Sequence, residues 1–209
     1  MHAALGDPLR LSIVDDLIVS DRSPREISAR LGIASNLLAH HLEVLESAGV
    51  IRRTTSAGDR RRRYIRLNRR APVISNLVAP APQRPLLFLC THNSARSQLA
   101  AVMWTARTGR PAGSAGTQPA ERVHRGAVAA ARRLGLSLDG AVPCGISTIP
   151  GRTQVITVCD TVHEELEPGD DWWHWSIPDP VTTGDRAAFD AVVDELTTRI
   201  EALTHEEDQ

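Results

Sequence analysis

The 209-residue sequence contains no lysine, only three cysteines and only seven aromatic residues. Three cysteines are too few, and too odd in number, for the disulfide framework of a small secreted domain. Seven rings offer too few stacking platforms for a protein that binds single-stranded nucleic acid through its bases. No apolar run approaches the roughly 18 residues of a membrane span, and no apolar signal segment precedes Asp7, so no membrane contact is expected. These absences predict a cytosolic protein with reduced thiols.

The positive charge, all of it arginine, is distributed unevenly along the chain. Residues 1–84 carry 14 Arg against 8 acidic residues, a net charge of +6. Residues 85–209 carry 10 Arg against 17 acidic residues, a net charge of −7. A basic half joined to an acidic half indicates that the first half binds a polyanion and the second does not. Each half is long enough to bury a core of its own.

The first half has the pattern of a helix-turn-helix followed by a β-hairpin. Residues 23–26, Ser-Pro-Arg-Glu, combine an N-cap, a first-turn proline and a capping-box glutamate, which predicts a helix that ends at Gly32. A second helix is predicted over 34–48, because its leucines share one face. Two alternating strands, 50–54 and 64–67, flank a turn and predict a hairpin wing.

In a helix-turn-helix the second helix enters the major groove of DNA. Ser35, Asn36 and His40 lie on its expected solvent side, within reach of base edges. The residues expected to contact phosphates are the four consecutive arginines of the hairpin, Arg60, Arg61, Arg62 and Arg63. The first half is therefore predicted to bind double-stranded DNA, although the same pattern also suits a protein-interaction module.

Residues 5–68 resemble the ArsR-type winged-helix transcriptional regulators. The matching phrases are Leu-Gly-Asp-Pro-Leu-Arg-Leu at 5–11, Leu-Gly-Ile at 31–33 and the run from His40 to Ile51. The resemblance implies a homodimer bound to a palindromic DNA operator. No cysteine precedes Cys90, so the thiolate metalloid site common in this family's DNA-binding domain is absent, and no metal site is expected.

Prolines interrupt the segment between the two halves, which is typical of a linker. We therefore expect a winged helix-turn-helix domain over 1–70, a linker over 71–84 and a second domain over 85–205. In the second domain, apolar strand patterns alternate with helical patterns. That alternation predicts an α/β fold with a parallel sheet, whose ligand chemistry lies at the carboxyl ends of the strands.

The most informative segment of the chain is Cys-Thr-His-Asn-Ser-Ala-Arg-Ser at 90–97, which follows the apolar run 86–89. A strand that turns sharply through a C-x5-R loop into a helix directs successive backbone N–H groups, and the positive helix end, at one point. Such a cup holds a tetrahedral oxyanion and stabilises the thiolate of Cys90. Arg96 adds a forked, permanently charged donor. The loop residues expected to surround the oxyanion are Thr91, His92, Asn93, Ser94, Ala95 and Ser97.

Asp179-Pro180 is the second chemical element of this half. A carboxylate on a proline-stiffened loop suits a general acid that protonates the oxygen leaving a group attacked by Cys90. An Asp-Pro pair alone would be no more than a turn. Downstream of a C-x5-R loop in an α/β pattern, it predicts the acid of the reaction.

Residues 85 to about 203 resemble the low-molecular-weight phosphotyrosine phosphatase superfamily, and within it the arsenate reductases. The matching phrases are Asn-Ser-Ala-Arg-Ser-Gln at 93–98, Ser-Ala-Gly-Thr at 114–117 and His174-Trp175 ahead of Asp179-Pro180. The resemblance implies an α/β fold of the low-molecular-weight phosphatase type. Phosphatases usually place an aromatic residue after Asp-Pro, where this chain has Val181, so the platform for a substrate ring is missing.

The resemblance to reductases also implies a mechanism. Cys90 attacks arsenate held by the loop amides and Arg96, while Asp179 assists departure of water or hydroxide. A second thiol then attacks the Cys90 sulfur, and arsenite leaves as a disulfide or mixed disulfide forms. Reductases have a thiol where Cys159 stands, so Cys159 is the best internal candidate. No bound cofactor is expected. The external reductant is thioredoxin, or a low-molecular-weight thiol acting with a glutaredoxin-like protein.

Two departures from the family pattern leave alternatives open. His92 replaces a glycine usual in the loop, and Leu166 stands where thioredoxin-coupled reductases have a third cysteine. Recycling therefore uses Cys144 or a small thiol. Two other functions suit the same residues: hydrolysis of phosphotyrosine or small phosphoesters, and non-catalytic sensing of an oxyanion or arsenite.

Overall fold

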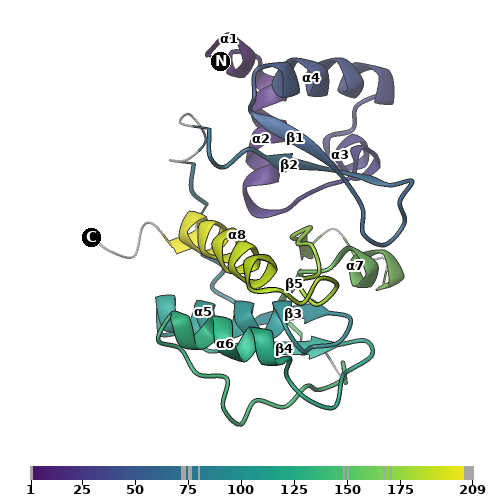
Figure 1. The fold of residues 1–209 in the computed structure, drawn as a ribbon. Helices are drawn as coiled ribbons and strands as arrows, with labels where there is room; N and C mark the ends of the chain where they lie inside the picture. The colour runs from purple at the N-terminus through teal and green to yellow at the C-terminus, as the bar shows by residue number, and fades with distance from the viewer. Residues whose placement is uncertain are drawn as a thin grey trace. The chain divides into compact units, whose positions relative to one another are not determined.

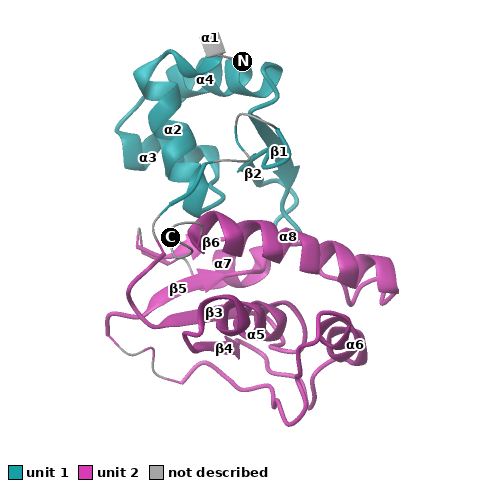
Figure 2. Cartoon of the chain, turned by 90° about the vertical axis from the view of Figure 1, so that its left-hand side faces the viewer, with its two compact units in different colours: residues 1–79 teal, residues 80–209 magenta. Residues whose placement is uncertain are grey.

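The computed structural model describes residues 2–71, 74, 77–79, 81–147, 149, 151–166, 168–169 and 171–204. The chain divides into two compact units, residues 1–79 (unit 1) and 80–209 (unit 2), coloured separately in Figure 2. Pro72 and Pro80 of the expected linker, and residue 205 at the expected end of the second domain, lie outside the described residues. None of the described helices combines the length and the apolar character needed to cross a membrane.

Unit 1 is a helix-turn-helix with an antiparallel hairpin (Figure 1). Its described elements are α1 (His2–Leu5), α2 (Pro8–Val19), α3 (Pro24–Leu31), α4 (Ser35–Ser47), β1 (Ile51–Thr55) and β2 (Arg63–Leu67). The two strands pair with Ile51 opposite Leu67. The buried core joins the three longer helices to the hairpin through Ile13, Leu17, Ile27, Leu38, Leu45 and Ile65. The predicted winged helix-turn-helix is confirmed.

Local sequence sets the ends of the unit 1 helices. The Ser23 hydroxyl accepts a bond from the amide of Glu26, and the Glu26 carboxylate accepts one from the amide of Ser23 at 2.6 Å. This is the predicted capping box, with Pro24 as the first helical residue. Gly32 ends α3 with a φ of +64°, a conformation that glycine adopts without strain.

Unit 2 is built on a four-stranded sheet of order β4-β3-β5-β6, in which every pairing is parallel. Its described elements are β3 (Leu86–Cys90), α5 (Arg96–Thr108), β4 (Ala112–Gly116), α6 (Arg125–Arg133), β5 (Gln154–Thr157), α7 (Asp160–Leu166), β6 (Trp173–His174) and α8 (Arg186–Thr204). Helix α5 packs with α6 and α8, whereas α7 packs against β3 and β5. The predicted parallel α/β fold is confirmed.

The strand register brings the carboxyl ends of three strands to one edge of this sheet. Cys90, the last residue of β3, lies opposite Gly116 of β4, and Leu89 lies opposite Thr157 of β5. The interior of β3 is fully buried at Phe88 and Leu89. A parallel strand buried on both faces reads as a continuous apolar run, which is the pattern of residues 86–89.

Gly116 lies against the backbone of the segment that follows Cys90. An ideal Cβ atom on Gly116 would lie 2.5 Å from the Thr91 carbonyl oxygen and 2.9 Å from the Asn93 amide nitrogen. Both are backbone atoms, which cannot swing aside as a flexible side chain can. Any larger residue at this position must therefore displace the loop after β3.

We expect Gly116→Ala to lower the free energy of unfolding of unit 2 by about 1–3 kcal/mol, the usual cost of overpacking. The four tryptophans of the chain all lie in unit 2, so urea unfolding followed by tryptophan fluorescence reports on this unit. Gly145→Ala is the matched control, because a Cβ atom there would meet only Pro119, at 3.8 Å. Equal losses of stability in the two variants would contradict the argument.

Candidate active site and nucleic-acid interface

The loop between β3 and α5 turns its carbonyl groups outward. Its outer hydrogen bonds run from Gln118 N to Thr91 O (2.8 Å), Ala120 N to His92 O (3.0 Å) and His124 N to Ser94 O (2.8 Å). In a trans peptide plane the carbonyl and the following N–H point in opposite directions. The amides of His92, Asn93 and Ala95 therefore face the inner side of the loop. Successive inward amides form a nest that suits an anion.

Asn93 gives the loop its sharp turn. Its φ of +47° is left-handed, a conformation that asparagine tolerates better than most residues. The amide of Asn93 points to the Cys90 sulfur at 3.2 Å, as the outward carbonyls require. The backbone of the loop and its hydrogen bonds thus agree on the direction of the amides.

Two donors converge on the sulfur of Cys90, which is buried at 2% exposure. One is the Asn93 amide, and the other is the Ser97 hydroxyl at 3.0 Å. The Asn93 side-chain nitrogen donates to the Ser97 oxygen at 2.8 Å, so that oxygen keeps its own proton for the sulfur. Both donors lie at the N-terminal, positive end of α5, so they and the helix dipole direct positive potential at the sulfur. Cys90 therefore has the surroundings of a nucleophile.

The Asn93 side chain also receives two hydrogen bonds at its oxygen. Gln98 Nε2 donates to it at 3.0 Å, and the amide of Cys144 donates at 2.9 Å. The loop is thereby fastened to α5 and to the segment beside β4. Sequence reasoning missed both partners, since an amide donor 51 residues away leaves no local signal.

Arg96 joins the loop to the segment that carries Asp179. Its Nη1 donates to the Ile177 carbonyl oxygen at 3.0 Å, and its Nη2 donates to Asp179 Oδ2 at 2.8 Å. The other Asp179 oxygen accepts the amide of Val181 at 3.0 Å. The guanidinium is 5% exposed, whereas the Asp179 side chain is 32% exposed and faces solvent in part. A substrate oxyanion that binds Arg96 Nη2 competes with the Asp179 carboxylate for this nitrogen.

The structure brings Cys159 to the loop. The amide of Val158 donates to the Leu89 carbonyl oxygen at 2.8 Å, which extends the β3–β5 ladder by one step. Cys159 then comes beside Thr91, whose hydroxyl lies 3.3 Å from the Cys159 sulfur. The thiol is free and 3% exposed. Cys90 and Cys159, 69 positions apart in sequence, thus lie at the carboxyl ends of neighbouring strands: Cys90 is the last residue of β3, and Cys159 follows the end of β5 by two residues.

Cys144 lies on the other side of β3, beside β4. The Gly116 amide donates to the Cys144 carbonyl oxygen at 2.9 Å, and the Cys144 sulfur contacts the Ser114 carbonyl oxygen at 3.1 Å. This thiol is free and exposed. Leu166, at the predicted position of a third family cysteine, ends α7 and is 38% exposed.

An open groove of about 1290 Å³ adjoins the loop. Its lining includes His92, Ser94, Arg122, Arg125, Val128 and Val181. The His92 ring lies outside the cup, where its Nδ1 is 3.0 Å from the Gln118 carbonyl oxygen, so a side chain replaces glycine without filling the cup. Among the described residues, no group of His, Cys, Asp and Glu side chains is arranged to hold a metal ion.

In unit 1 the predicted DNA-reading residues are exposed on α4. Ser35, Asn36 and His40 all lie on its solvent side, whereas His41 is buried at 7% exposure, 3.8 Å from Asp7. Base contacts come from the first turns of such a helix, where Ser35 and Asn36 lie.

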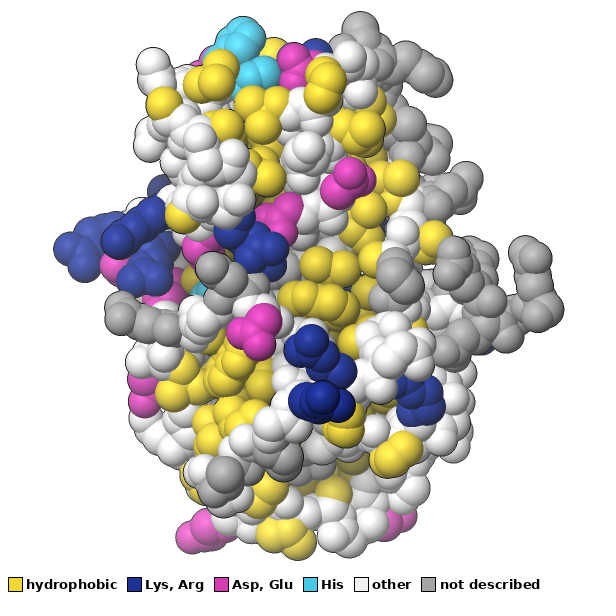
Figure 3. Space-filling view, turned by 180° about the vertical axis from the view of Figure 1, so that it is seen from behind, with side chains coloured by type: hydrophobic (Ala, Val, Ile, Leu, Met, Phe, Trp, Pro, Cys, Tyr) yellow, Lys and Arg dark blue, Asp and Glu magenta, His cyan; other side chains and the backbone are white. Residues whose placement is uncertain are grey.

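The arginines of the hairpin differ in their partners. Figure 3 shows basic side chains gathered where the hairpin of unit 1 projects. Arg61 binds both oxygens of Asp59, at 3.0 and 3.2 Å, and this holds the pKa of Asp59 below its usual range. Arg63 donates to the carbonyls of Arg60 and Arg62. The side chains of Arg60 and Arg62 form no hydrogen bond or ion pair within the described part of unit 1.

Comparison with known proteins gives an assignment for each unit. Residues 85–208 match the low molecular weight phosphotyrosine protein phosphatase family, and residues 5–54 match a helix-turn-helix domain. No curated protein sequence matches the chain. The two assignments imply a DNA-binding part and an enzyme domain that acts on an oxyanion substrate.

Similar solved structures include both reductases and phosphatases. An arsenate reductase in the oxidized state is 22% identical over 59% of this chain and 98% of its own, with a TM-score of 0.51. The YwlE arginine phosphatase from Geobacillus stearothermophilus is 24% identical over 59% and 92%, with a TM-score of 0.51. The tyrosine phosphatase Wzb from Escherichia coli K30, in complex with sulphate, is 19% identical over 56% and 94%, with a TM-score of 0.50.

At these identities the likeness shows the fold of unit 2. The family model covers more than half of the chain, and its match begins just before β3 and includes the loop, Arg96 and Asp179. The chain therefore belongs to the low molecular weight phosphotyrosine protein phosphatase family, with a helix-turn-helix domain ahead of the enzyme domain.

Proposed function

We propose that unit 2 is a thiol-dependent arsenate reductase and that unit 1 makes the chain an ArsR-type transcriptional regulator. The observation that carries the reductase proposal is the second buried thiol, Cys159, 3.3 Å from the Thr91 hydroxyl of the loop. Hydrolysis of a phosphoester needs one nucleophile and water. Reduction of arsenate needs a second thiol within reach of the first.

In the first step the Cys90 thiolate attacks arsenic, and a sulfur–arsenic bond replaces an arsenic–oxygen bond. The inward amides of the loop and Arg96 hold the remaining oxygens and stabilise their charge. Arg96 Nη2 exchanges its Asp179 partner for the oxyanion. Asp179, released from the ion pair and in part exposed to solvent, takes up a proton from water and passes it to the leaving hydroxyl group of arsenate, which departs as water.

In the second step the Cys159 sulfur attacks the sulfur of Cys90. The Cys90–Cys159 disulfide forms, and the electron pair of the sulfur–arsenic bond remains on arsenic, which leaves as arsenite. The two thiols are thereby oxidised and arsenic is reduced from the +5 to the +3 state. An external thiol, thioredoxin or a small thiol with a glutaredoxin-like protein, then reduces the disulfide.

The exposed Cys144 gives the external reductant an accessible thiol close to the loop.

The three cysteines of the described residues are free thiols. The proposed reaction needs them reduced, which is the state that the cytosol maintains.

A phosphatase is the second candidate, and the groove beside the loop favours it. A volume of about 1290 Å³ exceeds what a bare tetrahedral oxyanion fills and suits an extended phosphoester. Val181, 39% exposed at the rim, provides no aromatic platform, which argues against phosphotyrosine itself.

Single-turnover chemistry without added reductant separates these functions. The parent protein should release about one arsenite per chain and lose about two free thiols, because Cys159 resolves the Cys90 adduct. Cys159→Ser should release almost none, whereas Cys144→Ser, the matched control, should behave like the parent. Arsenite and thiols are counted after rapid mixing with arsenate.

Equal arsenite release from Cys159→Ser and the parent would rule out the resolving role. Turnover of an aryl phosphate with no loss of thiols, and no arsenite from arsenate, would favour the phosphatase.

For unit 1 we propose that two copies of the chain bind a palindromic DNA operator through α4 and the hairpins. The exposure of Ser35, Asn36 and His40 on α4 supports their contact with base edges. The exposure of the hairpin arginines supports contact with phosphates, and within the described part of unit 1 the side chains of Arg60 and Arg62 form no ion pair, whereas Arg61 binds Asp59.

Arg62→Ala should weaken binding to a DNA duplex of arbitrary sequence and lower the slope of log K against log salt by about 1. Arg61→Ala is the matched control and should change the slope less, because Asp59 already offsets the charge of Arg61. Fluorescence anisotropy over a salt series measures both slopes. A slope for Arg62→Ala equal to that of the parent would contradict the proposed contact between Arg62 and a phosphate.

A further inference from the structure

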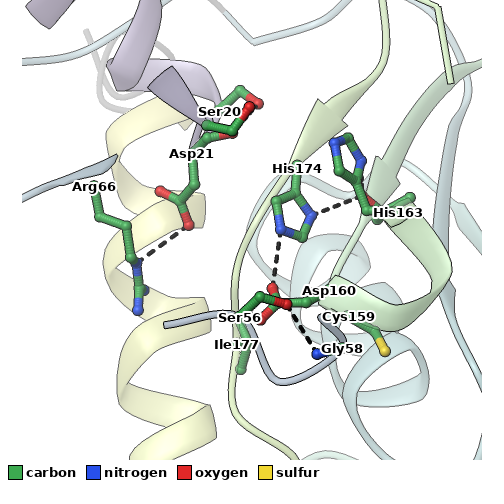
Figure 4. Close-up of polar contacts among 12 residues, drawn as sticks. Ser20, Asp21, Ser56, Gly58, Arg66, Cys159, Asp160, His163, His174 and Ile177 are labelled. Atoms are coloured by element: carbon green, nitrogen blue, oxygen red, sulfur yellow. Dashed lines mark hydrogen bonds and ion pairs between the residues drawn. The ribbon is translucent and has the colours of Figure 1, made fainter. Parts of the chain in front are cut away.

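His174, in β6, is a buried titratable residue that the proposed reaction does not use. Its side chain is 0% exposed, and both ring nitrogens are hydrogen-bonded. Nδ1 lies 2.9 Å from the Thr157 hydroxyl, and Nε2 lies 3.0 Å from Asp160 Oδ1, as Figure 4 shows for the bond to Asp160. Burying such a pair costs desolvation that apolar residues would avoid. Stability alone therefore explains the cluster poorly.

The two partners of His174 bracket Cys159 in the sequence. Thr157 lies two residues before the thiol, at the end of β5, and Asp160 follows it, at the start of α7. The amide of Trp175 also donates to the Thr157 carbonyl oxygen at 2.8 Å. The turn that carries Cys159 is thus held on both sides by one imidazole.

The Thr157 hydroxyl has one proton and two acceptors within reach, His174 Nδ1 at 2.9 Å and the more distant Trp173 carbonyl oxygen at 3.3 Å. Asp160 accepts, so His174 Nε2 carries the proton and Nδ1 accepts the proton of Thr157. The Thr157 oxygen then accepts from His163 Nδ1, at 3.1 Å. The His163 ring stacks on that of His174, with centroids 4.2 Å apart. Hydrogen bonds are thus donated from His163 to Thr157, from Thr157 to His174 and from His174 to Asp160. Each of these side chains is buried.

The segment that follows His174 in the sequence carries Asp179, the proposed acid. Residues 175–177 are each less than 5% exposed, so the segment from His174 towards Asp179 is firmly packed. Arg96 binds this segment at the Ile177 carbonyl oxygen and at Asp179. A displacement of His174 is therefore transmitted both to the thiol turn and to the acid.

We propose that His174 is a positioning residue that fixes Cys159 beside the loop and ties its place to that of Asp179. The inference rests on the proposed function, in which Cys159 resolves the adduct on Cys90. The rate at which one sulfur attacks another depends on how the two atoms are placed. A displacement of about 1 Å can lower the rate of such a step roughly 100-fold. The bond to Asp160 is the part of the cluster closest in sequence to the thiol.

Two substitutions test separately the two hydrogen bonds of His174, to Asp160 and to Thr157. His174→Gln keeps an amide near the place of Nε2, within reach of Asp160. His174→Asn is shorter and keeps a polar atom only near the place of Nδ1, toward Thr157. Both variants lose the imidazole ring and its packing, so each controls for the loss of the aromatic group in the other.

The readout is the effective concentration of Cys159 toward Cys90 in glutathione redox buffers, in the full chain carrying Cys144→Ser. Alkylation and mass spectrometry give the fraction of Cys90–Cys159 disulfide. We expect His174→Asn to lower the effective concentration about tenfold or more, and His174→Gln to stay within about threefold of the parent. Equal values in all three proteins, or equal losses in the two variants, would overturn the proposal.

The parent protein provides a second measurement should His174→Asn not fold. Nitrogen-15 NMR of the histidine rings should show the His174 Nε2 signal shifting when the Cys90–Cys159 disulfide forms, because the turn that carries Asp160 moves. His40, in unit 1, is the reference ring. An unshifted His174 signal in the oxidised protein, or no disulfide at any glutathione ratio, would overturn the proposal.

Neither measurement uses arsenate, so the two proposals fail separately. Absence of arsenite release, together with a His174-dependent effective concentration, would reject the reductase alone. Release that depends on Cys159, together with an unchanged effective concentration in His174→Asn, would reject the positioning role alone.

Discussion

The side-chain amide of Asn93 is the interaction on which the candidate active site depends. Its nitrogen orients the Ser97 hydroxyl toward the Cys90 sulfur, and its oxygen gathers donors from Gln98 and from the backbone of Cys144. The residue is 0% exposed and adopts a left-handed conformation, so the same position turns the backbone and holds the side chains. An apolar residue here would remove one hydrogen-bond partner each from the Ser97 hydroxyl, the Gln98 side chain and the Cys144 backbone amide.

Arg96 and Asp179 pair with each other at the loop. The Asp179 carboxylate accepts a hydrogen bond from one terminal nitrogen of the Arg96 guanidinium. A substrate oxyanion would be a partner of the same type, since it also accepts through negatively charged oxygens. In the proposed reaction, binding of the substrate to Arg96 and release of Asp179, the proposed acid, are therefore one event.

Local features of this protein followed from the sequence, whereas its long-range contacts did not. The capping box at Ser23, the end of α3 at Gly32 and the turn through the C-x5-R loop each depend on a few adjacent residues, and the structure has all three. The contact of Cys159 with Thr91 depends on strand register, and the bonds of His174 depend on how β5, β6 and α7 pack. The spacing of apolar residues along the sequence does not predict such contacts, because they form only when segments distant in the sequence pack together.

The presence of both units in one chain has a consequence for their amounts in the cell. Translation supplies the helix-turn-helix and the thiol loop in a fixed one-to-one ratio, with no assembly step between separate polypeptides. Any copy that binds DNA therefore carries its own enzyme domain, and one messenger RNA sets the number of both domains in a cell.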